Sequence, residues 1–264
     1  MTDFETIRVA RDERGVATLT LARPDKHNAM SAQMIAELTR AADLLGDDDG
    51  VRAVVLAAQG KSFCAGGDLG WMRAQMEADR ATRIAEATKL ARMLMALDRM
   101  PRPLIGRVHG NAFGGGVGLA SVCDIAIGTE AVKMGLTETR LGIIPATIGP
   151  YVVARTGAAR ARQVFMSARV FGAAEAERLG LLARVVPEAD LDAAVEAEVA
   201  PYLACAPGAV AAAKALIRDV STPPDEAMIR ATIEALADRW ETSEADEGIA
   251  AFFEKRRPAW ASGA

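Results

Sequence analysis

The chain has 264 residues, of which 51% are hydrophobic and 25% are charged, and its formal net charge is −4. This is the composition of a globular protein that can bury a sizeable core, and the slight negative charge argues against a broad basic surface for nucleic acid. Only two histidines are present, so a histidine-built metal site or a Ser-His-Asp triad has almost no material.

The first half of the chain alternates short apolar runs with helical patterns. The apolar alternation over 7–21 is broken at Asp12 to Gly15, which predicts a two-stranded hairpin. Ser31 is placed to cap a helix whose apolar residues recur at helical spacing. The continuous apolar run Val51 to Ala58 predicts a buried strand, and the small and polar residues over 59–70 predict a loop.

Similar units follow along the chain. A long helical pattern from about Asp79 to Met100 ends before two prolines, and Leu104 to Val108 is typical of a second buried strand. The glycine cluster over 114–118 opens a short helix, after which 124–127 predicts a further strand. Repeated strand, turn and helix units predict an α/β core with mainly parallel pairing.

The character of the sequence changes beyond about Arg155. Alanine-rich helical patterns dominate there, and β-branched runs almost vanish apart from the one at 183–186. The end of the chain looks wholly helical, with apolar residues three and four positions apart. We therefore predict a core over 1–200 and a C-terminal helical region over 201–264.

Cysteine usage and the start of the chain bear on its location. The three cysteines are odd in number and form no C-x-x-C pair, which argues against a disulfide framework or a structural zinc site and favours a reducing, cytoplasmic compartment. The N-terminus has neither the basic nor the apolar region of a signal peptide. No stretch reaches about 18 uninterrupted apolar residues, so we expect no membrane span and no membrane partner.

Two glycine-rich segments could present backbone N–H groups to a ligand. In SFCAGGDL, over 62–69, small residues follow a strand and permit unusual backbone angles, although an ordinary loop would look the same. In HGNAFGGGVG, over 109–118, the glycines follow a buried strand and open a helix, whose free N–H groups favour negative charge. The position three after Gly116 is Leu119, so the dinucleotide spacing G-x-G-x-x-G is not met.

A third segment, MGLTETRLGIIP over 134–145, holds one carboxylate among apolar residues. Apolar surroundings would raise the pKa of Glu138 and suit it to proton transfer. The alternative is a surface glutamate that pairs with Arg140 or begins a helix.

Taken in order, these segments resemble the crotonase (enoyl-CoA hydratase/isomerase) superfamily, from the first hairpin to the C-terminal helices. The matching pieces are RPDKHNAM at 23–30, FCAGGDL at 63–69, GNAFGGG at 110–116, CD at 123–124 and LGIIP at 141–145. The resemblance implies an α/β fold with a ββα spiral core that binds an acyl-CoA thioester. It also implies a homotrimer, or a hexamer made as a dimer of trimers, assembled through the C-terminal helices.

The resemblance also assigns roles at the reacting centre. It implies an oxyanion hole made by the backbone N–H groups of Ala65 and Gly115, with Glu138 as the catalytic carboxylate. Donors placed where enolate charge develops contribute about 3 kcal/mol each. The family's hydratases usually carry a second glutamate, and its position here is Gly118, which has no side chain.

One carboxylate is sufficient for a 3-enoyl to 2-enoyl isomerase, and hydration stays open because Glu138 could activate the water while another acid or the same water supplies the second proton. The segments 118–119, 123–127 and 136–148 are similar to bacterial methylglutaconyl-CoA hydratases of leucine degradation, which favours hydration. Such a substrate has a distal carboxylate, for which Arg140 or an arginine after Trp71 could serve. A third interpretation is an acyl-CoA-binding protein of this fold without turnover.

The family pattern implies the residues that hold CoA, which the substrate itself carries; no other cofactor and no metal are expected. From one subunit they are Lys26, Ala29, Ala65, Gly67, Asp68 and Leu69. The C-terminal helix of a neighbouring subunit would place Phe252 over the acyl chain or pantetheine and Lys255 near a phosphate. Alternatively, the basic end of that helix is a solvated helix terminus. Trp71 and Met72 are expected to line an acyl pocket.

Overall fold

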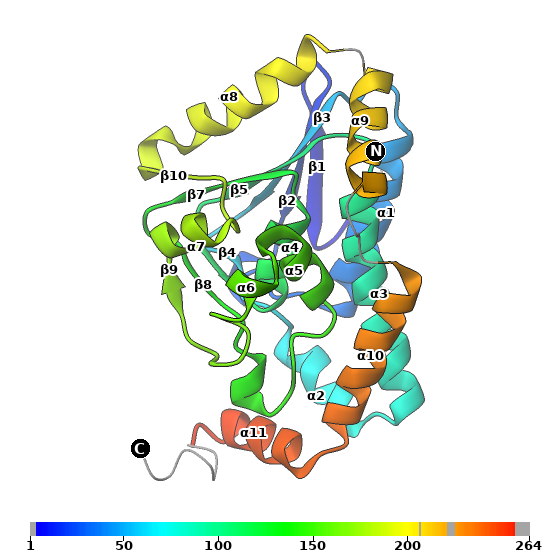
Figure 1. Cartoon of the computed structure of the whole chain (residues 1–264), viewed down its shortest axis with the longest axis vertical. Coiled ribbons are helices and arrows are strands. Elements are labelled where there is room, and N and C mark those ends of the chain that lie inside the picture. The colour runs from blue at the N-terminus through cyan, green and yellow to red at the C-terminus, as the bar shows by residue number, and fades with distance from the viewer. Residues whose placement is uncertain (1–3, 206, 221–224, 257–264) are drawn as a thin grey trace.

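The computed structural model describes residues 4–205, 207–220 and 225–256. At its centre are two β-sheets (Figure 1). The larger sheet has the order β1 (Ile7–Arg11), β2 (Val16–Leu21), β3 (Ala53–Ala58), β5 (Leu104–Val108), β7 (Ile125–Thr129) and β10 (Arg184–Val186). The smaller has the order β4 (Ser62–Cys64), β6 (Asn111–Phe113), β8 (Lys133–Gly135) and β9 (Phe171–Gly172).

From β3 to β8, successive strands alternate between the two sheets. The chain passes from β3 to β4, from β5 to β6 and from β7 to β8, and each pass ends in helical structure before the next begins. Only the hairpin β1–β2 and the pair β8–β9 are antiparallel within these sheets. This arrangement confirms the predicted α/β fold with a ββα spiral and mainly parallel pairing.

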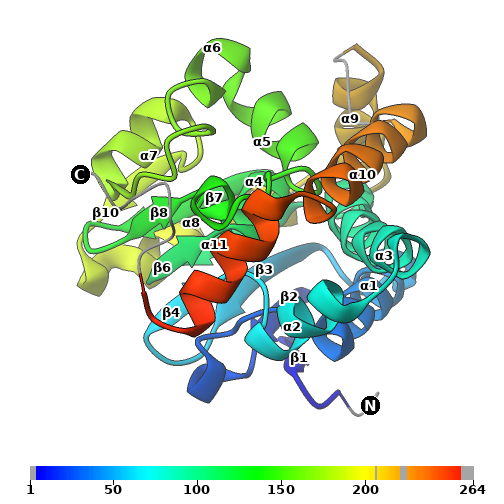
Figure 2. The ribbon, with the colours of Figure 1, turned by 90° about the horizontal axis from the view of Figure 1, so that it is seen from below.

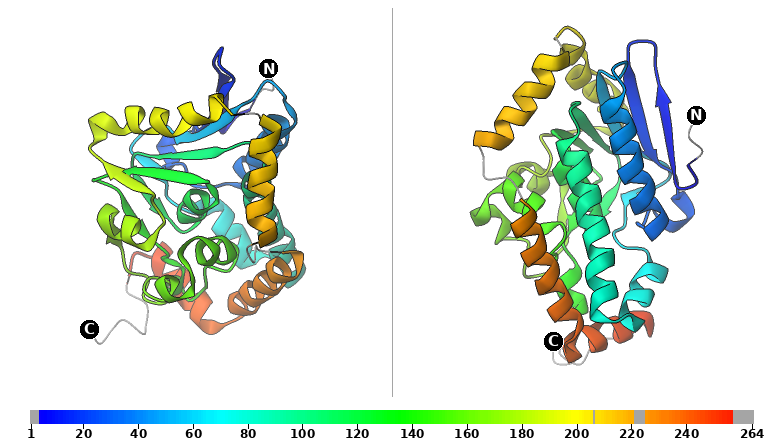
Figure 3. Two further views of the ribbon diagram at one scale, coloured as in Figure 1. Left: turned by 45° about the horizontal axis from the view of Figure 1, so that its top comes forward. Right: turned by 90° about the vertical axis from the view of Figure 1, so that its right-hand side faces the viewer.

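The two long helices of the spiral begin at capping side chains, of which the sequence predicted Ser31. In α1 (Ala32–Asp47) Ser31 Oγ accepts a hydrogen bond from Met34 N at 3.2 Å, and in α3 (Arg80–Arg99) Asp79 accepts one from Thr82 N at 2.8 Å. The two helices run side by side (Figure 3, right), and their buried faces belong to one hydrophobic core with β2 and β3. The shorter helical elements are η1 (Pro24–Lys26), α2 (Leu69–Glu77), α4 (Gly115–Val122), η2 (Glu138–Leu141), α5 (Gly149–Thr156), α6 (Ala158–Ala161), α7 (Ala173–Leu179) and η3 (Glu188–Asp190).

The predicted loop over 59–70 is partly wrong. It contains β4 and the first turn of α2, where Asp68 caps the helix by accepting from Gly70 N at 2.9 Å. The strands of the smaller sheet are only two or three residues long, too short for apolar alternation to reveal them. For this reason the apolar pattern of the sequence did not reveal them.

The C-terminal part contains α8 (Leu191–Leu203), α9 (Pro207–Val220), α10 (Glu226–Trp240) and α11 (Ser243–Phe253). Viewed from below, α10 lies beside α3 and α11 lies across the spiral core (Figure 2). A second hydrophobic core joins α3 to Ile233 and Trp240 of α10 and to Ile249 of α11. Arg80 at the start of α3 also pairs with Glu234 at 2.8 Å. These helices therefore fold back onto their own chain.

Within the described residues, no single helix is long and apolar enough to cross a membrane. One bent pair of helices, 188–203 and 207–218, meets the length and composition requirement only when the two are counted together.

Candidate active site

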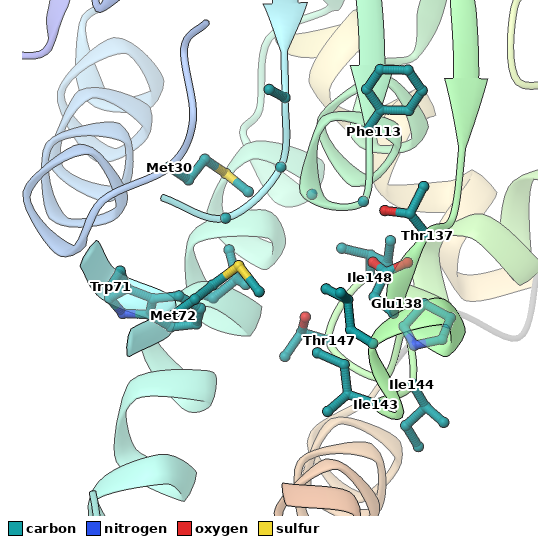
Figure 4. Close-up of a pocket in the computed structure, with 18 of the residues that line it drawn as sticks. Met30, Trp71, Met72, Phe113, Thr137, Glu138, Ile143, Ile144, Thr147 and Ile148 are labelled. Atoms are coloured by element: carbon teal, nitrogen blue, oxygen red, sulfur yellow. The ribbon is translucent and has the colours of Figure 1, made fainter. Parts of the chain in front are cut away.

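A cavity of about 380 Å³ opens where the two glycine-rich segments meet the segment that carries Glu138 (Figure 4). Its walls come from distant parts of the chain, and most of the side chains are apolar. They include Met30, Ala65, Gly67, Leu69, Trp71, Met72, Leu90, Gly114, Gly115, Thr137, Glu138, Arg140, Ile143, Thr147, Ile148, Leu236, Trp240 and Phe252. The expected place of Trp71 and Met72 in an apolar pocket is confirmed.

Glu138 begins the short helix η2 and directs its carboxylate into the cavity. Its Oε2 atom is buried and has no hydrogen-bond partner among the residues that the structure describes. Its Oε1 lies so close to Gly114 that a Cβ atom added there would stand 3.0 Å away. Burial raises the pKa of Glu138 to about 7, as its apolar surroundings predicted.

The alternative reading of Glu138 as the ion-pair partner of Arg140 is wrong. Arg140 Nη2 instead donates a hydrogen bond to the carbonyl oxygen of Ala168 at 3.2 Å, across the loop that leads to β9. No ion pair of Glu138 occurs in the described part of the chain, so its carboxylate is left for whatever enters the cavity.

The raised pKa of Glu138 predicts the pH dependence of any reaction that uses it as a base. Only the ionised carboxylate accepts a proton, and its fraction falls as the pH drops through about 7. We expect kcat/KM to fall about tenfold per pH unit below that value, measured from pH 5 to 9 with the fold monitored by circular dichroism. A rate that stays level down to pH 5 with the fold intact would contradict this assignment.

Gly115 is the first residue of α4, and no earlier residue of that helix can accept its N–H, so this donor is free to face the cavity. The expected partner, Ala65, is wrong as a donor because its N–H already donates to the carbonyl oxygen of His27 at 3.0 Å. Ala65 does line the cavity.

The N–H of Gly67 is the donor that the structure offers in place of Ala65. The carbonyl oxygen of Gly66 accepts a hydrogen bond from Met30 N at 2.8 Å, and Asp68 N donates one to Met30 O at 3.0 Å. In this parallel pairing the N–H of Gly67, which lies between those two residues, points away from Met30. Among the described residues the N–H of Gly67 makes no hydrogen bond. Its direction depends on the φ of +99° at Gly66, which no motif spacing reveals.

Gly118 stands where family hydratases usually carry a second glutamate, and Ile148 fills the space beside it. A Cβ atom added to Gly118 would stand 2.6 Å from Cγ2 of Ile148 and 3.1 Å from its Cβ, so Ile148 occupies the space that a larger residue 118 would need. Among the described residues, the cavity wall therefore has one carboxylate, with Ile148 in the space of the second one that family hydratases usually carry.

The residues expected to hold CoA divide into two groups. Ala65, Gly67, Leu69 and Phe252 line the cavity, whereas Lys26, Ala29, Asp68 and Lys255 do not. Ala29 is buried and offers its carbonyl to Arg23, and Asp68 pairs with Arg23 at 3.0 Å while capping α2. These two residues therefore hold the loop in shape. Lys26 and Lys255 are exposed.

The position of Phe252 corrects the expectation that a neighbouring subunit supplies it. In this structure α11 of the same chain brings Phe252 to the cavity, while Leu236 and Trp240 of α10 complete that wall. Sequence reasoning missed Leu236, Trp240, Thr147 and Ile148, because only the fold brings these positions to Glu138.

Comparisons with known proteins agree with this geometry. The family model described as enoyl-CoA hydratase/isomerase matches residues 11–263. The chain belongs to this family, within the crotonase superfamily.

Individual relatives match over nearly their whole length. A protein of Mycobacterium bovis named as a probable enoyl-CoA hydratase is 37% identical over 262 residues, which is 97% of each chain. The solved structure of an enoyl-CoA hydratase from Mycobacterium smegmatis is 38% identical with a TM-score of 0.79, covering 97% of this chain and 99% of that one. One from Mycobacterium avium has a TM-score of 0.86 at 31% identity, covering 97% and 98%.

Proposed function

We propose that this protein is an enoyl-CoA hydratase that adds water to a 2-enoyl-CoA thioester. The observation that carries the proposal is the buried carboxylate of Glu138, whose Oε2 has no partner among the described residues, in one apolar cavity with the N–H groups of Gly67 and Gly115. Two donors can bind the thioester oxygen as it gains charge, and the carboxylate can move a proton beside it.

The reaction balances with these groups alone. The water oxygen bonds to C3 and loses a proton to Glu138, while the C2=C3 electron pair shifts to give an enolate whose oxygen is bound by Gly67 and Gly115. Glu138 then returns the proton to C2 and the thioester carbonyl re-forms. The apolar walls exclude other water and strengthen both hydrogen bonds.

Within this class we propose methylglutaconyl-CoA, an intermediate of leucine degradation, as a substrate. The proposal is supported by the resemblance of the segments around Gly118 and Glu138 to the bacterial hydratases of that compound. It is also supported by Arg140, the one Lys or Arg among the described residues of the cavity wall. Its guanidinium has further N–H donors besides the one on Ala168, and these suit a distal carboxylate.

A specific observation favours a second candidate, a 3-enoyl to 2-enoyl isomerase. Ile148 closes the place where family hydratases usually carry their other glutamate, so one carboxylate has to serve alone. Moving a proton from one carbon to another requires only such a base.

Heavy-oxygen labelling separates the candidates. The protein is incubated with methylglutaconyl-CoA, crotonyl-CoA and a 3-enoyl-CoA in H₂¹⁸O, and the products are followed by mass. We expect labelled 3-hydroxyacyl-CoA from the 2-enoyl esters, with methylglutaconyl-CoA giving the higher kcat/KM. A shift of the double bond without mass gain would replace hydratase by isomerase, and no product from any ester would indicate an acyl-CoA-binding protein.

Several points stay predictions from the sequence. They are the trimeric or hexameric assembly, the role of residues 201–264 in that assembly, the cytoplasmic location, and the contacts of Lys26 and Lys255 with CoA phosphates.

A further inference from the structure

Thr147 is a polar side chain that has no partner in the described part of the chain. The residue is only 8% exposed, yet it lines the cavity. Figure 4 shows its hydroxyl oxygen directed into the cavity, between Met72 and Glu138. No hydrogen bond of this hydroxyl occurs among the described residues. Because this hydroxyl is open to the cavity and has no partner there among the described residues, it is available to a molecule that enters the cavity.

The backbone holds Thr147 in this position through its neighbour. Ile148 is 2% exposed and fills the notch that Gly118 leaves in α4. The carbonyl of Ile148 also accepts from Tyr151 N and Val152 N, both at 3.1 Å, which begins α5. The residue before such a fixed point has little freedom. Position 118, where family hydratases usually have a glutamate, is a glycine here and leaves room for Ile148. The packing of Ile148 in turn fixes the hydroxyl of Thr147 at the edge of the site.

Water that attacks C3 needs two hydrogen bonds to be aimed. Glu138 can accept one of its protons, and the apolar side chains of Ile143 and Ile148, which also line the cavity, offer no acceptor for the other. A hydroxyl can accept that hydrogen and, unlike a carboxylate, adds no second buried charge beside Glu138.

We propose that the Thr147 hydroxyl positions the attacking water, taking the place of the second carboxylate that the chain lacks. Thr147 is a positioning residue in this scheme, because Glu138 alone moves the proton. The inference rests on the proposed hydratase function and adds to it the group that makes one carboxylate sufficient for hydration.

The test compares Thr147→Val, which removes the hydroxyl at nearly constant shape, with Thr147→Ser, which keeps it. Two rates are measured on each protein: incorporation of ¹⁸O into crotonyl-CoA, and exchange of the C2 protons of butyryl-CoA in D₂O. The second reaction uses Glu138 and the N–H donors but no attacking water. We expect Thr147→Val to lose about 10- to 100-fold in kcat for hydration, with its KM and the exchange rate within about threefold of wild type.

Thr147→Ser should recover most of the hydration rate. Thr156→Val is the matched control, since Thr156 is a buried threonine at the end of α5 whose hydroxyl already donates to Val152 O at 2.8 Å, and its rates should equal those of wild type.

The remaining outcomes each overturn the inference. Hydration by Thr147→Val at the wild-type rate removes the role of the hydroxyl but leaves the hydratase proposal intact. Equal loss of hydration and exchange shows that Thr147 only supports the fold of the site. Exchange without any ¹⁸O incorporation by the wild-type protein removes the hydratase proposal and the positioning role together.

Discussion

Replacing Glu138 by glutamine should lower kcat for hydration by about 10³- to 10⁴-fold while KM changes little. Glutamine keeps the size of the side chain, so the cavity keeps its shape, but an amide cannot accept and return a proton. The buried Oε2 has no hydrogen bond to lose among the described residues, so the fold should be unaffected. Initial rates with crotonyl-CoA over a range of concentrations check both parameters.

The control is Glu130→Gln, which makes the same chemical change at an exposed glutamate outside the cavity wall and should leave both parameters as in wild type. If Glu138→Gln kept more than a tenth of the wild-type kcat, the catalytic base would have to be sought elsewhere.

Gly116→Ala should lower the free energy of unfolding by about 3 kcal/mol. A Cβ atom at this position would collide with the carbonyl oxygen of Cys64 and would stand 3.0 Å from the Cβ of that residue. Neither residue can move easily, because Cys64 is fully buried at the end of β4 and Gly116 lies in the first turn of α4. The clash can be relieved only by moving the two glycine-rich segments apart.

Separation of these two segments should also lower the catalytic rate. Gly67 and Gly115 lie on opposite sides of this contact, so their N–H groups would no longer meet the same oxygen, and we expect kcat/KM to fall about 10²-fold in whatever protein remains folded. Urea denaturation and initial rates measure the two effects. Gly172→Ala is the control, since a Cβ there has no atom within 4 Å and φ is −86°; it should change stability by less than about 0.5 kcal/mol. Wild-type stability in Gly116→Ala would contradict the close approach.

The strands of the larger sheet and the apolar surroundings of Glu138 could both be predicted from the sequence, for a physical reason. Buried parallel strands such as β3 are continuous apolar runs, and helices such as α1 have a cap and a 3.6-residue period, so both can be recognised locally. Glu138 is recognisable because a charge in an apolar segment is rare. These features depend on neighbours in the sequence alone.

The parts that could not be predicted depend on the direction in which backbone N–H groups point and on contacts between residues far apart in the sequence. Whether Ala65 or Gly67 presents its N–H is decided by a positive φ at Gly66 and by the pairing of this segment with Met30. Thr147 owes its position to Ile148 packing on Gly118, thirty residues earlier in the chain. A motif shows that such residues are present, and the fold decides which atoms face the substrate.

The wall formed by Leu236, Trp240 and Phe252 has a consequence for the newly made chain. At translation rates of about 5 to 20 residues per second, Trp240 is added about 5 to 20 s after Glu138. During that interval the growing polypeptide already contains Glu138, Gly67 and Gly115, but the apolar wall that α10 and α11 supply has not been synthesised. The complete apolar cavity around Glu138 thus forms only after α11 has been synthesised.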